Sequence, residues 1–472
     1  MMARGLPRIG FAVLAVFAAP VHAAAADAGE DPRESLAYHV GTIAYLWGYP
    51  IVDLTKQLHN ETHRVSAPQP VAAPLNRFYR HAQLVTPEAA GELRAPNHDT
   101  LYFGGWFDLT NEPVVIQTPD TQGRYYTLAI TDFFNEVTHI GRRTTGTQAQ
   151  VLALAGPATP KVAIPPGVHV VEVATSQVWI LGRLLVNGVA DLPDAQRLLR
   201  GFWAAPWSRW RRDQPPPEEP VPAGTRLDPM QSIAFFTHLN QWLRANKVPP
   251  QELALLGLFD QIGIGPSHRF EPESLDAGTR RGLDRAIADG RAMLINMARQ
   301  PQSDVRNGWI FPLQLADYGQ NYLLRASVAF GGYANRPEET VYAALLRDAD
   351  GAALTGQLRY RLHFSPGEQP PVGAFWSVTA YDARTLQLIP NGTRRFSVGN
   401  LTPKLQRGRD GSIAIEISTR PPKNQRVNWL PVGRDPFMLI LRMYEPGPAV
   451  LDGRFGPPPI EVLGDLPLRS TP

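Results

Sequence analysis

Apolar residues recur at helical spacing near the start of the chain and again in its middle third. Within residues 36–56, the positions that share one helix face are Leu36, Val40, Ile43, Ala44 and Trp47. The triplet Gly48-Tyr49-Pro50 is expected to interrupt or end this helix, because the residue before a proline disfavours the α conformation. Further helical patterns cover residues 193–210, 230–245, 250–258 and 272–299.

Short strand-like runs, separated by Asn, Asp, Gly and Pro, fill two other regions of the chain. The first set comprises residues 100–108, 113–119, 125–132, 162–173 and 178–186, and the second comprises 358–364, 375–381, 413–417 and 437–444. Residues 358–364 alternate strictly between apolar and polar side chains, which is typical of a half-buried strand.

The order of these patterns predicts an α+β fold that is mainly β, with two β-sandwich-like domains and an α-helical segment between them. We expect the N-terminal helix and the first β domain in residues 32–212. Residues 213–306 would form a linker and the helical segment, and 307–472 the second β domain. The proline-rich stretch 214–224 favours a linker or a long loop.

The first 23 residues have the features of a cleavable signal peptide. Arg4 and Arg8 precede the apolar stretch 9–19, and Val21-His22-Ala23 fits the small-residue cleavage rule. Cleavage would lower the formal net charge from +3 to +1, because it removes two arginines. We therefore expect a periplasmic or secreted protein without a stable membrane anchor.

Composition excludes several kinds of site. The chain has no cysteine, so disulfides, thiolate nucleophiles and cysteine-based metal sites are ruled out. It has no basic run of the kind that binds nucleic acid. The familiar nucleotide-binding and hydrolase motifs are also missing from the sequence.

The first polar cluster, residues 97–100, directly precedes a predicted strand. His98 and Asp99 could supply a base and a carboxylate at the rim of a pocket, with Asn97 and Tyr102 contacting the substrate. The alternative is turn chemistry, in which the Asn and Asp side chains bond to nearby backbone N–H groups.

The second polar cluster, residues 132–146, follows another predicted strand. Asp132, Glu136 and His139 could act as acid and base or hold a hard metal ion, although their spacing is not diagnostic of a metal site. Arg142 and Arg143 could clamp a carboxylate or phosphate, or could be a solvated pair.

We expect Asn97, Asp99, Asp132 and Arg142 to meet in one pocket if the two strands concerned are antiparallel neighbours, because the start of one would then lie beside the end of the other. In that case Asp99, Asp132 and Glu136 would be catalytic. The alternative is that Asp99 and Asp132 only bond to backbone groups at strand ends.

The second β domain mixes aromatic side chains with hydrogen-bonding groups. Trp376 and Trp429, together with Tyr381 and Arg442, could form a platform for a sugar or another small polar ligand. A buried aromatic core is the alternative explanation for both tryptophans.

The motifs of both halves resemble a known family arrangement. In the N-terminal half they are residues 44–50, 96–102, 112–115, 123–126 and 141–146. In the C-terminal half they are residues 375–382, 410–412, 428–431 and 442–444. In this order they are similar to bacterial proteins that pair domain of unknown function 1254 with domain of unknown function 1214.

This resemblance implies two β-sandwich-like domains joined by helices, often in an exported protein. It implies no settled activity, so no catalytic residue can be transferred. His98 departs from the Asn or Arg expected at its position, which favours Asn97, Asp99 and Thr100 for any role shared across the family.

Three functions fit these observations. The first is a hydrolase or lyase that uses carboxylate acid/base chemistry on a small or polymeric polar substrate. The second is a periplasmic protein that binds a carbohydrate or another small molecule, and the third is a non-catalytic envelope protein. No cofactor is predicted, and a divalent metal is a secondary alternative. An enzyme should gather several carboxylates in one pocket, whereas a binding protein should present an aromatic platform.

Overall fold

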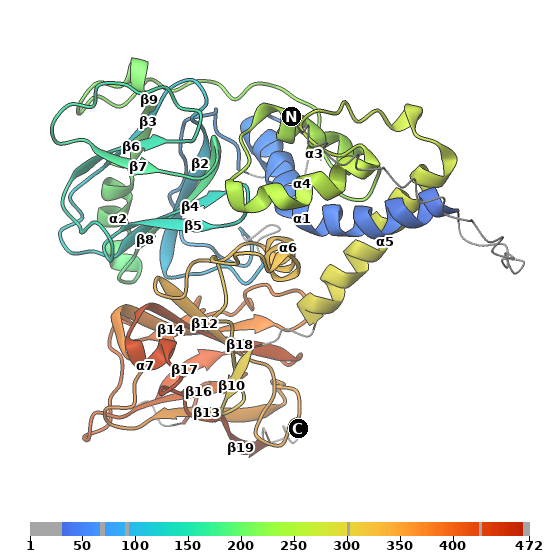
Figure 1. Cartoon of the computed structure of the whole chain (residues 1–472). Helices are drawn as coiled ribbons and strands as arrows, with labels where there is room; N and C mark the ends of the chain where they lie inside the picture. Colours follow the sequence, from blue (N-terminus) through green and yellow to red (C-terminus); the bar gives the residue numbers. More distant parts are fainter. Residues whose placement is uncertain (1–30, 67–70, 90–93, 300–302, 424–426, 466–472) are drawn as a thin grey trace, which may run out of the picture.

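The computed structural model describes residues 31–66, 71–89, 94–299, 303–423 and 427–465. The predicted signal peptide therefore lies outside the described residues. Four β-sheets and a cluster of helices form an α+β fold that is mainly β, as predicted. Figure 1 shows the first sandwich above the second, with the helices beside the first. None of the described helices is both long and apolar enough to cross a bilayer.

The first sandwich packs a five-stranded sheet against a four-stranded one. The larger sheet has the order β1 (Tyr79–His81), β2 (Thr100–Asp108), β8 (Gln177–Leu185), β4 (Tyr126–Asp132), β5 (Val137–Gly141). The smaller has the order β7 (His169–Glu172), β6 (Gln150–Ala155), β3 (Val114–Thr118), β9 (Trp203–Pro206). Alternate side chains such as Phe103, Ile180 and Leu152 fill the core between them.

The second sandwich packs a six-stranded sheet against a four-stranded one. The larger sheet has the order β10 (Asp304–Arg306), β11 (Trp309–Phe311), β12 (Thr340–Leu345), β18 (Phe437–Pro446), β14 (Val372–Asp382), β15 (Ser397–Gly399). The smaller has the order β17 (Asn428–Pro431), β16 (Ile413–Ser418), β13 (Leu358–Phe364), β19 (Glu461–Asp465). Val378, Leu441 and Phe364 are among its core residues.

The helices are α1 (Pro32–Thr62), α2 (Leu192–Leu199), α3 (Ala234–Ala245), α4 (Leu253–Phe259), α5 (Ala277–Arg299), α6 (Tyr322–Gly331) and α7 (Pro448–Leu451). Residues of α1, α3, α4, α5 and α6 share one apolar core, so α1 joins the helices that follow the first sandwich in sequence. Apolar burial by this core holds the helices together.

Several details differ from the sequence prediction, of which these are examples. Helix α1 continues through Pro50 although proline removes one backbone hydrogen bond, because buried packing stabilises both sides of it; Gly48, for example, lies directly against Leu239. The helix predicted over 193–210 ends at Leu199 and gives way to strand β9. The strand predicted over 162–173 is limited to β7, and β6 was not predicted.

Candidate functional site

Strand β8 places one arginine on the outer face of the first sandwich. Its residues alternate, so Ile180 and Leu184 enter the core while Arg183 points the other way. Arg183 lies in register between Tyr102 of β2 and Thr127 of β4. This outer face is therefore cationic at a central strand, where a charged side chain is unusual.

Strand β18 likewise places an arginine on the outer face of the second sandwich. Leu441 and Met443 enter the second core, whereas Arg442 points outward and lies in register with Tyr342 of β12 and Ser377 of β14. The Arg442 side chain is completely buried, with 0% of its surface exposed. The surface that covers it comes in part from the first domain, since its Nη2 donates a 2.6 Å hydrogen bond to the carbonyl of Ala95.

Tyrosines surround both guanidinium groups. Arg183 lies over the ring of Tyr102 at 5.5 Å, and Arg442 lies over the rings of Tyr342 and Tyr381 at 4.9 and 5.3 Å. Tyr102, Tyr342 and Tyr444 lie within electrostatic reach of both arginines. We call this set the arginine–tyrosine cluster; its members are Tyr102, Arg183, Tyr342, Tyr381, Arg442 and Tyr444.

A short hydrogen-bond chain orients the hydroxyl groups of the cluster. The Asn97 side-chain oxygen accepts the backbone N–H of Asp99 at 2.5 Å, so its amide NH2 group faces and donates to the Tyr444 hydroxyl. The Tyr444 and Tyr342 hydroxyl oxygens lie 3.0 Å apart. When Tyr444 donates to Tyr342, the Tyr342 O–H is left to donate to a ligand.

No carboxylate within the described residues forms an ion pair with Arg183 or Arg442. Arg183 Nη1 donates to the amide oxygen of Asn335 at 3.1 Å, but Arg183 Nε and both Nε and Nη1 of Arg442 are buried without a hydrogen-bond partner. Nearby acids are already engaged: Glu339 pairs with Arg143. Arg442, which is fully buried, and Arg183, which is partly buried, therefore lack a counter-charge, which is costly unless an anion supplies it.

The tyrosines cannot supply this counter-charge near neutral pH. Burial raises the pKa of Tyr102, Tyr381 and Tyr444 above that of a free phenol, although the arginines oppose the shift. These phenols therefore stay neutral and contribute dipoles and ring faces. Guanidinium groups remain protonated throughout, so the cluster is a cationic site suited to a small anion.

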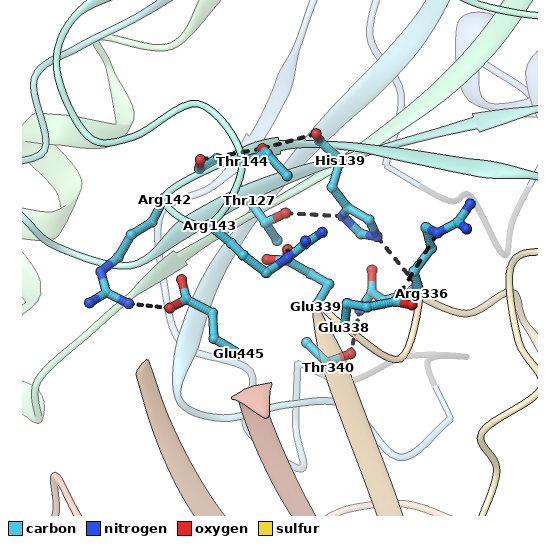
Figure 2. A network of polar contacts seen from close by, with 12 residues as sticks. Thr127, His139, Arg142, Arg143, Thr144, Arg336, Glu338, Glu339, Thr340 and Glu445 are labelled. Carbon is cyan, nitrogen blue, oxygen red and sulfur yellow. Dashed lines mark hydrogen bonds and ion pairs between the residues drawn. The ribbon is translucent and has the colours of Figure 1, made fainter. Parts of the chain in front are cut away.

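A separate network of ion pairs fixes the two domains to each other beside the cluster (Figure 2). Arg143 donates to Glu339 at 2.7 Å, and Arg142 donates to Glu445 and, at 3.1 Å, to the Gly373 carbonyl. Burial, and then the charge of Arg143, lower the pKa of His139 to about 3. The neutral His139 ring accepts the Arg336 backbone N–H at Nε2, so its Nδ1 carries the proton and donates to Thr127.

Four of the predicted site residues lie at or next to the arginine–tyrosine cluster. Tyr102 belongs to it, and Asn97 positions Tyr444. Asp99 joins the domains, because its carboxylate accepts the hydroxyl groups of Ser377 and Ser397 at 2.5 and 2.7 Å. His98 bonds to the Val85 carbonyl at 2.5 Å and packs edge-on against Phe396.

Asp132 and Glu136 lie elsewhere, on a cavity of about 390 Å³ that Glu252 and Arg336 also line. Asp132 Oδ1 accepts the backbone N–H groups of Phe134 and Glu136 at 2.8 and 2.9 Å, which is the turn role considered above. Burial raises the pKa of Asp132 to about 7 and also raises that of Glu136.

The predicted meeting of Asn97, Asp99, Asp132 and Arg142 is wrong. Strands β2 and β4 both pair with β8, so they run parallel to each other on either side of it rather than as antiparallel neighbours. The backbone of Asp99 bonds to Val186, whereas Asp132 lies opposite Val178. Eight residues of strand separate these positions, about 26 Å at about 3.3 Å per residue.

Other predicted roles also change. Arg142 makes the interdomain contacts described above. Trp376 is buried in the core of the second sandwich with 2% of its surface exposed, so its ring is not a ligand platform. Trp429 lies on strand β17 of the smaller sheet, and its Nε1 donates to the Ser418 carbonyl at 3.0 Å.

No three His, Cys, Asp or Glu side chains in the described ranges could hold a metal, so Asp132, Glu136 and His139 form no such site.

Sequence reasoning missed Arg183, Tyr342 and Tyr444 as site residues. A signal was present, because Arg183 and Arg442 each interrupt an otherwise apolar strand, VWILGRLLV and FMLILRMY. A charged residue inside a buried strand is rarely there for stability alone. The tyrosines carry no comparable signal, since aromatic residues are common in strands.

Fold and site together define a two-domain protein in which two β-sandwiches enclose a cationic, tyrosine-rich site. Residues 75–206 match a family model described as "Protein of unknown function (DUF1254)", and residues 339–448 match "Protein of unknown function (DUF1214)". The chain therefore combines both matches in this order, and the resemblance seen in the sequence is confirmed.

One solved structure supports the fold. A crystal structure of the VPA0106 protein from Vibrio parahaemolyticus has a TM-score of 0.70 and 22% sequence identity, covering 90% of this chain and 100% of that one. A structure of an uncharacterized protein from Burkholderia cenocepacia has a TM-score of 0.43 and 13% identity, covering 93% and 91%. A comparison with curated proteins found no match.

Proposed function

We propose that this protein binds a small anion between its two β domains through Arg183 and Arg442. The observation that carries the proposal is a pair of guanidinium groups, one fully and one partly buried, that have buried N–H donors without a partner and no acidic partner in the described ranges. A carboxylate or phosphate matches these donors in charge and geometry. If the N-terminal segment directs export, as its sequence predicts, binding takes place in the periplasm or outside the cell.

A thermal-shift measurement tests this proposal. A bound anion at one hundred times its Kd should raise the free energy of unfolding by about 2.7 kcal/mol. When acetate, phosphate and other small anions are screened in this way, we expect stabilisation by an anion that binds. Arg183→Met and Arg442→Met should each remove this response. Removal of an uncompensated buried cation should also leave the ligand-free variants folded.

The matched control is Arg197→Met, since Arg197 is an exposed arginine of α2 that pairs with Asp194. This variant should respond to anions as the unmodified protein does, which separates specific binding from general salt effects. Equal stabilisation of Arg183→Met and the unmodified protein by every anion would contradict the proposal.

A second candidate function, the hydrolase or lyase, is favoured by the cavity that Asp132 and Glu136 share. A carboxyl group that titrates near neutral pH can serve as a general acid or base. In this reading Asp132 and Glu136 keep their predicted catalytic roles, and Asp99 does not act with them. The substrate would be polar, because acids and Arg336 line the cavity.

The titration of Asp132 can be measured through stability. Its carboxyl keeps a proton in the folded protein up to about pH 7 but loses it near pH 4 when unfolded. The folded state thus binds more protons in this window, so the free energy of unfolding should fall as the pH rises from about 4 to 7. Asp132→Asn should show a shallower fall, because Glu136 and Glu61 still contribute theirs, while it keeps both backbone hydrogen bonds at its oxygen.

Chemical denaturation of both proteins at a series of pH values gives the comparison. Parallel profiles for the unmodified protein and Asp132→Asn would show that Asp132 has an ordinary pKa, and the acid/base reading would lose its support. A hydrolase activity found by screening should disappear in Asp132→Asn.

A further inference from the structure

The face that carries Arg183 continues along strand β8 to a group of aromatic side chains. Trp179, Leu181 and Arg183 all retain accessible surface, whereas Val178, Ile180 and Leu184 between them are fully buried in the core. Other parts of the protein nevertheless lie over this central strand. The positions of Arg183 and Trp179 are about 13 Å apart along the strand at about 3.3 Å per residue.

One of the covering groups is Tyr79 of the edge strand β1. A side chain on Gly104 would meet the Tyr79 hydroxyl at 2.8 Å, so the absence of a side chain there lets the end of the Tyr79 ring approach the sheet. Burial raises the pKa of Tyr79, Glu61 raises it further, and Arg183 lowers it. Tyr79 therefore lies within electrostatic reach of both Arg183 and Glu61.

The far end of this face is aromatic and weakly acidic. Trp106 stacks on Trp179 with ring centres 6.1 Å apart, and Tyr333 meets Trp179 edge-on at 5.7 Å. Trp106 Nε1 donates to Glu61 Oε2 at 2.8 Å, while Glu61 Oε1 has no hydrogen-bond partner in the described part of the chain. Burial raises the pKa of Glu61 to about 7, so its carboxyl can donate or accept near neutral pH.

The two ends of the face therefore differ in chemistry. The end at Arg183 offers unpartnered cationic donors, and the other offers aromatic side chains and a half-buried carboxyl group. A simple inorganic anion would use only the first end. A molecule with an anionic group at one end and a flat body would use both.

We infer that the ligand of the arginine–tyrosine cluster is a ring-containing monocarboxylic acid. Its carboxylate binds Arg183 and Arg442, its ring lies along Tyr79 and Trp179, and a hydroxyl group at its far end hydrogen-bonds to Glu61. This inference rests on the proposed function, because it assigns the cluster's anion a chemical class. A second carboxylate at the far end would meet Glu61, and also Asp53, which accepts the Tyr333 hydroxyl at 2.8 Å, and would be disfavoured.

Calorimetric titration with four acids tests the inference: acetate, benzoate, 3-(4-hydroxyphenyl)propanoate and the dicarboxylate terephthalate. We expect 3-(4-hydroxyphenyl)propanoate to bind at least tenfold more tightly than acetate, and terephthalate to bind less tightly than benzoate. Trp179→Leu should remove most of the preference for ring acids over acetate. Glu61→Leu should weaken 3-(4-hydroxyphenyl)propanoate about fivefold and leave benzoate unchanged, as expected for one hydrogen bond.

Trp207→Leu is the matched control, since Trp207 stacks on Trp210 in a separate cluster of the first domain and should not affect binding. Equal affinity for acetate and the ring acids, with both lost in Arg183→Met, would overturn this inference and leave the proposed function intact. Absence of binding by all four acids and by phosphate would overturn both.

Discussion

Replacement of Arg325 by methionine is expected to lower the free energy of unfolding by about 3–5 kcal/mol. Arg325 of α6 donates to Glu252 at 2.8 Å, and Trp47 of α1 donates to the other Glu252 oxygen at 2.6 Å. The Arg325 and Glu252 side chains are 1% and 4% exposed. The substitution therefore leaves a buried carboxylate without its counter-charge, in the core that joins the helices.

Urea denaturation measures the effect, and two further variants control it. Arg197→Met breaks the exposed pair with Asp194, whose side chains are 67% and 63% exposed, and should cost at most about 1 kcal/mol. Glu252→Gln combined with Arg325→Met should recover part of the loss, because no charge is then left unpaired. A loss below about 1 kcal/mol in Arg325→Met would contradict this expectation.

Much of the fold could be predicted from the sequence because the two kinds of element leave local patterns. The alternation in residues 358–364 and the apolar runs around β2, β4 and β8 depend only on which side chains face a core. Local patterns failed to predict the elements whose conformation depends on tertiary packing. Helix α1 passes through Pro50 because a buried environment on both sides stabilises it, which no short window can show.

The location of the chemistry was harder to predict because it depends on strand order. Asp99 and Asp132 each lie at the end of a strand, but the insertion of β8 between β2 and β4 separates them. The arginine–tyrosine cluster forms only when Arg183 and Arg442 meet across two domains, 259 positions apart in the chain. The sequence showed that each arginine interrupts an apolar strand, but not that the two strands face each other.

The tryptophans proposed as a ligand platform provide the last test, because core packing and ligand binding predict different results. Trp376→Ala is expected to lower the free energy of unfolding by about 3–5 kcal/mol, since its ring is buried 5.0 Å from Phe364 in the second core. Trp429→Ala removes one hydrogen bond from a partly buried side chain and should cost about 1–2 kcal/mol.

Urea denaturation of the two variants, with calorimetric titration of carbohydrates and carboxylates, separates the interpretations. A core role for Trp376 requires a large fall in the midpoint of unfolding at an unchanged slope against urea concentration. A platform role requires unchanged stability and weaker ligand binding.

Trp376 points into the core, away from the face that carries Arg442, and adjacent residues of a strand point to opposite faces. Its neighbour Ser377 is the residue that reaches the first domain, through Asp99. We therefore expect Trp376→Ala to reduce the stability of the sandwich that presents Arg442, and the carboxylate affinity of its folded fraction to remain unchanged.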